Sequence, residues 1–226
     1  MGEGAGGEGS GGGRVFAVLR DTMPSMFLRR TPVTAVLLVA IAIVYGLQLY
    51  NGEEFTAAGA NYGPAIQAGQ YWRLVTSMFL HGGLLHLALN GWALYQLGAL
   101  FEMLVGSPRM VLVYFVTGIA GSLVSAWFSK VPSVGASGAI FGLLGALIAF
   151  LARRRGALTP QGKAILMQLL FWAVVNVVFG FSDPQIDNSA HLGGCAAGLL
   201  LGFTLPERRR AALAPEPADG RSFREF

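Results

Sequence analysis

Residues 135–152 read GASGAIFGLLGALIAFLA, an apolar run with one hydroxyl, that of Ser137, close to its start. The run approaches the roughly 20 residues that a membrane-spanning helix needs. A second apolar run, 189–205, carries His191 at a similar place. Because a polar group in hydrocarbon is costly to bury without a partner, an intramembrane histidine indicates a functional site. The two runs therefore predict a membrane fold and nucleophilic chemistry within the bilayer.

The rest of the chain is equally apolar. Of its 226 residues, 54% are hydrophobic and 12% are charged, and the mean hydropathy is +0.55. These values are too apolar for a soluble domain of this length. We predict an all-α, polytopic membrane protein whose single domain is a bundle of six transmembrane helices, with spans at 33–50, 84–101, 110–128, 135–152, 164–181 and 189–205.

The predicted domain covers residues 31–206, between an N-terminal tail, 1–30, and a C-terminal tail, 207–226. The first 13 residues have low complexity, and we expect them to be disordered. They lack the positively charged start of a cleaved signal peptide, so the first span is expected to stay as an anchor.

Lysine and arginine set the expected orientation. With the N-terminus inside, 14 of the 16 basic residues fall in cytoplasmic segments, and only Arg73 and Lys130 fall outside. Such asymmetry predicts that both termini are cytoplasmic. The basic residues are spread over several loops beside spans, which indicates contact with lipid headgroups and excludes a nucleic-acid groove.

Cys195 is the only cysteine, so no internal disulfide can form. No Cys/His cluster has the spacing of a metal site, and we expect neither metal nor cofactor. A thiol nucleophile is conceivable, but a lone cysteine among Gly and Ala on a helix is more typical of packing.

The second, fourth and sixth spans all begin at the predicted outer face, and each carries polar residues near its start. These residues should lie at one depth and are candidates for one site: His86 and Asn90, then Ser137, then Asn188, Ser189 and His191. Asp187 precedes His191 by four residues and could orient it, but its position at a helix start indicates a cap first. We therefore expect a Ser–His pair without a third member.

Glycines favour a close contact between the fourth and sixth spans. A spacing of four residues lets two helix backbones approach, although ordinary membrane packing has the same pattern. Proton transfer needs the hydroxyl and the imidazole within about 3 Å of each other. Gly135 permits unusual backbone angles ahead of Ser137, and the helix start offers N–H groups to an oxyanion. The four-residue spacing of glycines occurs in two sets: Gly138 with Gly142 in the fourth span, and Gly194 with Gly198 and Gly202 in the sixth.

His86 and Asn90 lie four residues apart, on one helix face. They could be oxyanion donors or interhelical hydrogen-bond partners worth about 1 kcal/mol, and the spacing favours both equally. His81, just outside this helix, is expected to be a loop histidine and not a base.

Together these motifs resemble the rhomboid family of intramembrane serine proteases, over residues 33–205. Four motifs occur in the family's order: Trp72-Arg73, then His81, His86 and Asn90 as His-x4-His-x3-Asn, then Gly135-Ala136-Ser137-Gly138, then Ala190-His191-x-x-Gly194-x-x-x-Gly198.

The resemblance implies that Ser137 is the nucleophile and His191 the general base. It implies that His86, Asn90 and the Ser137 N–H stabilise the oxyanion. Glu102 would tie down the long loop after the first span, with Arg73 and His81 as further loop contacts. Phe141 stands where many members have tyrosine, so the ring is kept and a hydroxyl is lost.

The resemblance also implies a serine endopeptidase that cuts other membrane proteins in or near their transmembrane segments, in a bacterial inner (plasma) membrane. The 33-residue segment 51–83 suits an interfacial element. An inactive rhomboid-like binding protein is the first alternative, which the presence of both Ser137 and His191 disfavours. A channel or transporter is the second, and it would show charged spans and internal repeats. The natural substrate and the oligomeric state stay open.

Overall fold

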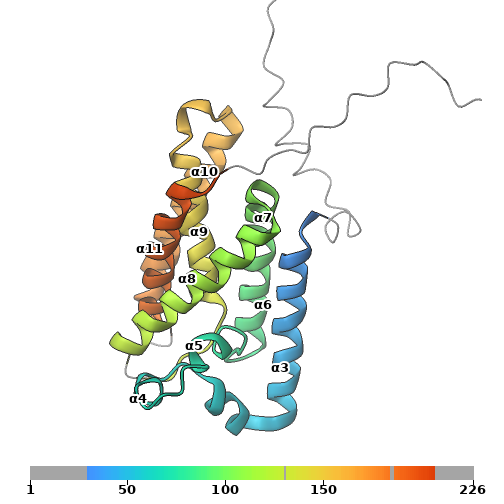
Figure 1. The fold of residues 1–226 in the computed structure, drawn as a ribbon, viewed down its shortest axis with the longest axis vertical. Coiled ribbons are helices and arrows are strands. Elements are labelled where there is room, and N and C mark those ends of the chain that lie inside the picture. The colour runs from blue at the N-terminus through green and yellow to red at the C-terminus, as the bar shows by residue number, and fades with distance from the viewer. Residues whose placement is uncertain (1–29, 130, 184–185, 207–226) are drawn as a thin grey trace, which may run out of the picture.

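The computed structural model describes residues 30–129, 131–183 and 186–206, and its regular elements in that part of the chain are helices (Figure 1). The all-helical prediction is confirmed, while the expectations for the tails fall almost wholly outside the described residues. In order, the helices are α3 (Pro32–Gly59), α4 (Gly63–Gln67), α5 (Arg73–Thr76), α6 (Leu84–Ala93), η1 (Leu94–Gly98), α7 (Ala99–Val105), α8 (Ser107–Phe128), α9 (Ser137–Ala152), η2 (Arg155–Ala157), α10 (Pro160–Gly180) and α11 (Asn188–Thr204).

Proline and glycine set several helix boundaries. Pro32, Pro108 and Pro160 lie in the first turns of α3, α8 and α10, where a helix does not need the missing N–H. Gly106, with a φ of 91°, makes the tight turn between α7 and α8. Gly52 has a φ of 77° and a non-helical ψ of −163°, which kinks α3. Residues 51–59, expected to begin a loop, are therefore helical beyond this kink.

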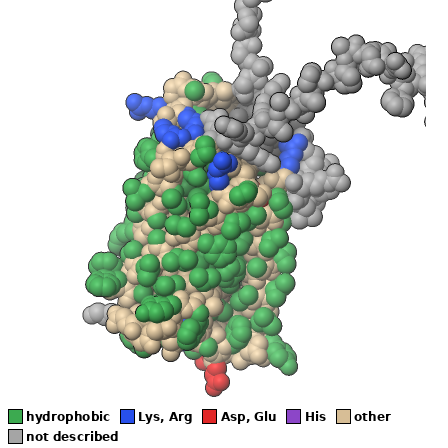
Figure 2. Space-filling model, viewed as in Figure 1, with side chains coloured by type: hydrophobic (Ala, Val, Ile, Leu, Met, Phe, Trp, Pro, Cys, Tyr) green, Lys and Arg blue, Asp and Glu red, His purple; other side chains and the backbone are tan. Residues whose placement is uncertain are grey.

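Four helices in the described part of the chain are long and apolar enough to cross a membrane: Pro32–Gly59, Leu84–Val105, Ser107–Phe128 and Pro160–Ser182. The second joins α6, η1 and α7 end to end. The helices α9 and α11 are shorter, with 16 and 17 residues. Figure 2 shows apolar side chains over the middle of the molecule, with Lys and Arg at one end and Asp and Glu at the other. This pattern is that of a protein embedded in a bilayer.

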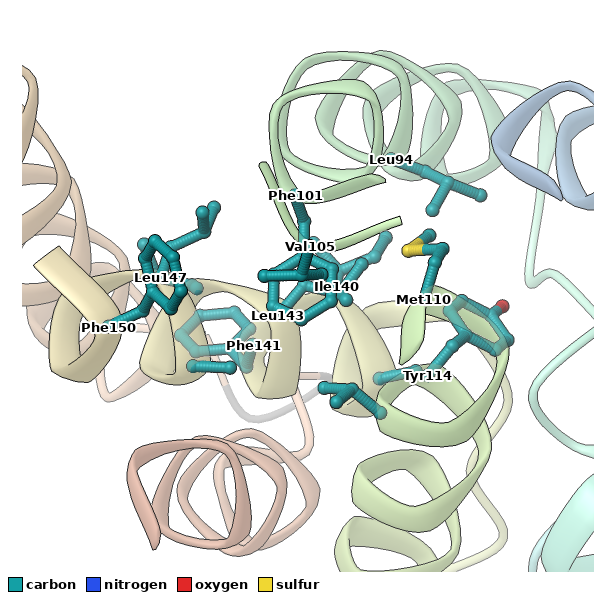
Figure 3. Close-up of a cluster of buried hydrophobic side chains, with 14 of the residues drawn as sticks. Leu94, Phe101, Val105, Met110, Tyr114, Ile140, Phe141, Leu143, Leu147 and Phe150 are labelled. Atoms are coloured by element: carbon teal, nitrogen blue, oxygen red, sulfur yellow. The ribbon is translucent and has the colours of Figure 1, made fainter. Parts of the chain in front are cut away.

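The core forms around α9, in which every residue from Gly138 to Leu151 is buried. It packs against α8 and α11 and also contacts α10. Figure 3 shows apolar side chains from several helices meeting there, among them Leu94, Phe101, Met110, Leu143 and Leu147.

The predicted glycine contact between α9 and α11 is confirmed. A Cβ atom added to Gly194, Gly198 or Gly202 would lie 2.0, 2.0 and 2.4 Å from carbonyl oxygens of α9. No real side chain tolerates such distances, so the two backbones touch. This contact fixes how the starts of α9 and α11 lie relative to each other.

The loop role expected for Glu102 is wrong. Its buried carboxylate accepts hydrogen bonds from the N–H groups of Val33 and Thr34, at 3.0 and 2.8 Å, and from the hydroxyls of Thr34 and Ser107, at 2.8 and 2.6 Å. It therefore holds the N-terminus of α3 and the start of α8. Glu102 lies near the far end of the helix that starts at Leu84, which is the end away from the first loop.

Candidate active site

Ser137 and His191 meet at the starts of two helices. Ser137 is the first residue of α9, and His191 lies in the first turn of α11. The Nε2 atom of His191 lies 2.8 Å from the Oγ atom of Ser137, within hydrogen-bond distance. His191 is buried, and its Nδ1 atom has no hydrogen-bond partner among the described residues. If Nε2 accepts the serine proton, Nδ1 carries the imidazole proton.

Asp187 does not bind the His191 imidazole. Its Oδ1 atom accepts from the N–H of Ala190 at 3.0 Å, and its Oδ2 atom accepts from the hydroxyl of Ser125. The first of these bonds is a helix N-cap, as the sequence indicated. The arrangement is therefore a pair of residues and not a triad.

Phe141 lies flat against the imidazole. The two ring centroids are 4.1 Å apart, and the planes differ by 9°. Phe141 comes one helical turn after Ser137, which places both side chains on the face of α9 toward α11. The ring thus restricts the rotation of His191 while Nε2 faces Ser137.

Gly135 brings His86 close to the serine. Its φ of +136° is a backbone conformation that favours glycine, and an added Cβ would lie 2.9 Å from His86 Cε1 and 3.6 Å from Ser137 Oγ. His86 Nδ1 accepts from the N–H of Gly82 at 3.3 Å. In the neutral ring of His86 the proton is then on Nε2. This atom lies 3.1 Å from the Cβ position built on Gly135. His86 therefore presents a donor near Ser137.

Asn90 is buried on the same helix face. One N–H of its amide donates to the carbonyl of His86 at 3.0 Å, and its Oδ1 atom has no partner among the described residues. This bond lies within its own helix and is not a contact to Ser137. A carboxamide has two N–H groups, so one donor is left beyond this bond.

His81 belongs to the wall of the site. Its backbone N–H donates to Gln48 Oε1 at 2.9 Å, and its carbonyl accepts from Gln48 Nε2 at 3.1 Å. Its ring meets that of His86 edge-on at 5.3 Å. Burial, with a smaller effect from His86, lowers the pKa of His81 to about 4. The neutral ring donates from Nδ1 to the carbonyl of Phe79 at 3.2 Å.

The first loop is tied to the strand-like segment before Ser137. Arg73 Nη1 donates to the carbonyls of Ala57 and Ala60, at 2.6 and 2.8 Å, so Arg73 does contact the loop. Asn61 and Ser133 exchange two backbone hydrogen bonds of 2.9 Å, and the N–H of Gly135 donates to the carbonyl of Ser77 at 2.9 Å. These contacts hold the chain that leads into α9.

A small open pocket borders Ser137 on the side of α8, with a volume of about 20 Å³, which is room for about one water molecule. Asn61, Ser122, Ser133 and Asp187 contribute to its lining. The Oδ1 atom of Asn61 is buried without a partner in the described part of the chain. The pocket can hold water beside the serine.

The sequence analysis missed Gln48, Asn61 and Ser125. Gln48 lies inside the first apolar run and Ser125 inside the third. A polar side chain within an apolar run was therefore the available signal, although other polar residues share each run. Asn61 had no such signal because it lies in a polar loop.

These observations define a class: a helical membrane protein in which a half-buried serine and a buried histidine meet at the starts of two glycine-packed helices. The Rhomboid domain model matches residues 68–208. The chain is 38% identical to rhomboid protease GluP from Bacillus subtilis over 193 residues, which are 82% of this chain and 37% of the relative. It is 42% identical to RHOMBOID-like protein 5 from Arabidopsis thaliana over 143 residues, 62% of this chain and 46% of the relative. It is 40% identical to RHOMBOID-like protein 7 from Arabidopsis thaliana over 146 residues, which are 64% of this chain and 46% of the relative.

The chain therefore belongs to the rhomboid family, as its motifs indicated. It is an integral, multi-pass membrane protein. It spans between a third and a half of the length of these curated relatives.

Proposed function

We propose that this chain is an intramembrane serine endopeptidase that hydrolyses peptide bonds in or near the transmembrane segments of other membrane proteins. The observation that carries the proposal is the 2.8 Å distance between His191 Nε2 and Ser137 Oγ. A serine hydroxyl bonded to an imidazole is an activated nucleophile, because the base can take the proton as the oxygen attacks. The similarity to GluP, a rhomboid protease, supports the same activity.

In the first step, Ser137 Oγ attacks the scissile carbonyl while His191 Nε2 takes its proton. The imidazolium then gives this proton to the leaving amine, and an acyl group stays on Ser137. In the second step, His191 takes a proton from a water molecule, and the resulting hydroxide attacks the acyl carbon. The bond to Ser137 Oγ then breaks, the imidazolium returns its proton to Ser137 Oγ, and the acid product leaves. Water in the pocket beside Ser137 would supply this step.

The negative oxygen of each tetrahedral intermediate needs hydrogen-bond donors. The backbone N–H of Ser137 is one, because the first N–H groups of α9 have no partner within the helix. The Nε2–H of His86 is the second, and the remaining N–H of Asn90 is the third.

The imidazole of His191 is oriented without a carboxylate. The Phe141 ring stacked at 4.1 Å takes this role. Stacking needs the ring alone, which explains why phenylalanine serves where many members of the family have tyrosine.

We also propose six membrane crossings within residues 31–206, α9 and α11 included. At 1.5 Å per residue, helices of 16 and 17 residues are about 24 and 26 Å long. The hydrocarbon core is about 30 Å thick. If their C-terminal ends reach the cytoplasmic surface, their starts lie below the outer surface, and we propose that Ser137 and His191 lie at this depth within the bilayer, next to the small pocket.

The basic end of the molecule in Figure 2 would face the cytoplasm, with both tails there, and the acidic end would face outward. In a bacterial cell this membrane would be the inner (plasma) membrane. The substrate's helix must unwind to expose a peptide bond, so from the family resemblance we expect helix-breaking Gly or Pro and a small residue before the cut. Transmembrane substrates and the bilayer are the expected partners.

The test is cleavage of a model transmembrane substrate by purified protein in liposomes. Ser137→Ala should abolish cleavage while the protein still inserts, since little packing volume changes. Ser182→Ala is the matched control, because among the described residues that exposed hydroxyl has one hydrogen-bond partner, the carbonyl of Val178 at 3.3 Å. Turnover by Ser137→Ala at the wild-type rate would overturn the proposal, and wild-type capture of substrate without cleavage would favour an inactive binding protein.

A further inference from the structure

The position of His191 depends on more than its side-chain contacts. Its ring touches Ser137 through Nε2 and Phe141 through its face. Both contacts act on the imidazole and leave open how the backbone of residue 191 is placed. That placement depends on the first turn of α11.

Asp187 holds this turn at two successive residues. Its Oδ1 atom accepts from the N–H of Ala190 at 3.0 Å, and its backbone carbonyl accepts from the N–H of His191 at 3.2 Å. The position of Asp187 therefore determines the position of the first turn of α11.

Asp187 is in turn anchored to α8. Its Oδ2 atom accepts a hydrogen bond from Ser125, whose side chain is 1% exposed. Ser125 Oγ also lies 3.3 Å from the hydroxyl of Ser133, in the segment that leads to Ser137. One carboxylate thus joins α8 and the start of α11, and Ser125 extends this link toward the start of α9.

The backbones of α8 and α11 also touch beside this link. An added Cβ on Gly121 would lie 2.6 Å from the carbonyl oxygen of Ala190, and one on Gly193 would lie 2.7 Å from Val124 Cβ. Such contact restricts the distance between the two helices. The bond between Ser125 and Asp187, at the end of the same contact, restricts how far the first turn of α11 slides or rotates.

We propose that Asp187, held by Ser125, is a positioning residue for His191. It acts by fixing the backbone of the first turn of α11, and its charge is not needed. The inference rests on the proposed function, because it concerns how the base is placed for that reaction. A displacement of about 1 Å in a reacting group can cost on the order of 100-fold in rate.

Three variants separate position from charge. Asp187→Ala removes both side-chain bonds, and we expect kcat to fall about 10- to 100-fold with KM nearly unchanged. Asp187→Asn keeps an oxygen for the cap and an N–H that can donate to Ser125 Oγ, so it should keep kcat within about 3-fold of wild type. Ser125→Ala leaves the cap intact and removes only the anchor, so kcat should fall by an intermediate factor, while KM again stays nearly unchanged.

Two matched controls test for a general loss of stability. Thr159→Ala removes the N-cap of α10, where Thr159 Oγ1 accepts from the N–H of Gly162 at 3.2 Å. Ser129→Ala removes the hydroxyl of the residue that follows α8, whose hydrogen bonds within the described part of the chain are to the backbone of Val131. Both should leave kcat per folded molecule unchanged.

The experiment measures kcat and KM for a model transmembrane substrate in liposomes, and the rate at which a fluorophosphonate reacts with Ser137. Wild-type kcat per folded molecule in both Asp187→Ala and Ser125→Ala would overturn the inference. So would an Asp187→Asn protein as slow as Asp187→Ala, since charge would then be the cause. If Asp187→Ala does not fold, Ser125→Ala against Ser129→Ala decides. A wild-type protein that neither cleaves nor reacts would instead overturn the proposed function.

Discussion

The helices α9 and α10 both come from long apolar runs of the sequence, yet they occupy different places in the bundle. In α9 every residue from Gly138 to Leu151 is buried, whereas in the most apolar window of α10 only 17% of the residues are buried. The face of α10 that is exposed carries large side chains, among them Phe171, Trp172 and Val178. In a membrane protein hydropathy identifies a span but not its place in the bundle. Small residues and a polar residue near the helix start, as in α9, identify the helix that carries the site.

The sharpest test of this comparison removes one polar residue from the α9–α11 pair and one from α10. His191→Ala should lower kcat by a factor on the order of 10⁴ to 10⁶, and the double variant with Ser137→Ala should be no slower, because the two residues act as a unit. Asn176→Ala on α10 is the control, since in the part of the chain that the structure describes its amide bonds the carbonyl of Trp172 alone, at 2.8 Å. Substrate cleavage in liposomes measures both. Equal losses in the two variants would mean that α9–α11 has no special role.

The glycine contact can be tested against an open glycine. Gly198→Ala should destabilise the fold by about 1–3 kcal/mol and remove most activity, because the new Cβ would lie 2.0 Å from the carbonyl oxygen of Gly142. Gly46→Ala in α3 has nothing within 4 Å of its Cβ and should be neutral or stabilising. Thermal unfolding in detergent gives the two values. Equal midpoints would show that α9 and α11 do not touch as described.

Asn90 tests whether the helix that starts at Leu84 belongs to the active region. Asn90→Ala should lower kcat about 100-fold and raise KM much less, as for a donor used mainly in the transition state. Kinetics per folded molecule provide the measurement. Full specific activity with a lower unfolding midpoint would show that Asn90 contributes only to the stability of the fold.

The smallest expected effect concerns Phe141. Phe141→Ala should lower kcat about 10-fold with the fold intact, because the imidazole loses the ring stacked at 4.1 Å. Phe141→Tyr should keep most activity, since it keeps the ring. If Phe141→Ala cleaves substrate at the wild-type rate, the ring does not position His191 and Phe141 only packs in the core.

The same contrast explains what the sequence could and could not predict. The positions of Ser137, His191 and the glycines of α11 were predictable. Helix periodicity puts the glycines on one face, where two backbones can approach, and Ser137 and His191 lie near the starts of the two helices that meet there. The role of Glu102 was not, because its partner depends on which helix ends are neighbours in the bundle. The residue lies near the C-terminus of one helix and binds the N-terminus of α3.

The first loop shows a second limit. Gly52 and the glutamates after it read as the start of a loop, but the chain resumes a helix after one kinked residue. The link from Ser125 to Asp187 joins residues 62 apart in the chain. Nothing in either local pattern indicates that pairing, so only the packed structure provides it.

The most direct test of the account is the reaction of the purified, liposome-embedded protein with a fluorophosphonate, followed by mass spectrometry of the labelled peptide. The account predicts one labelled residue, Ser137, and a rate that falls to background in His191→Ala but not in Asn176→Ala. Labelling at another residue, or labelling of Ser137 at an unchanged rate without His191, would contradict the claim that these two residues form the catalytic pair.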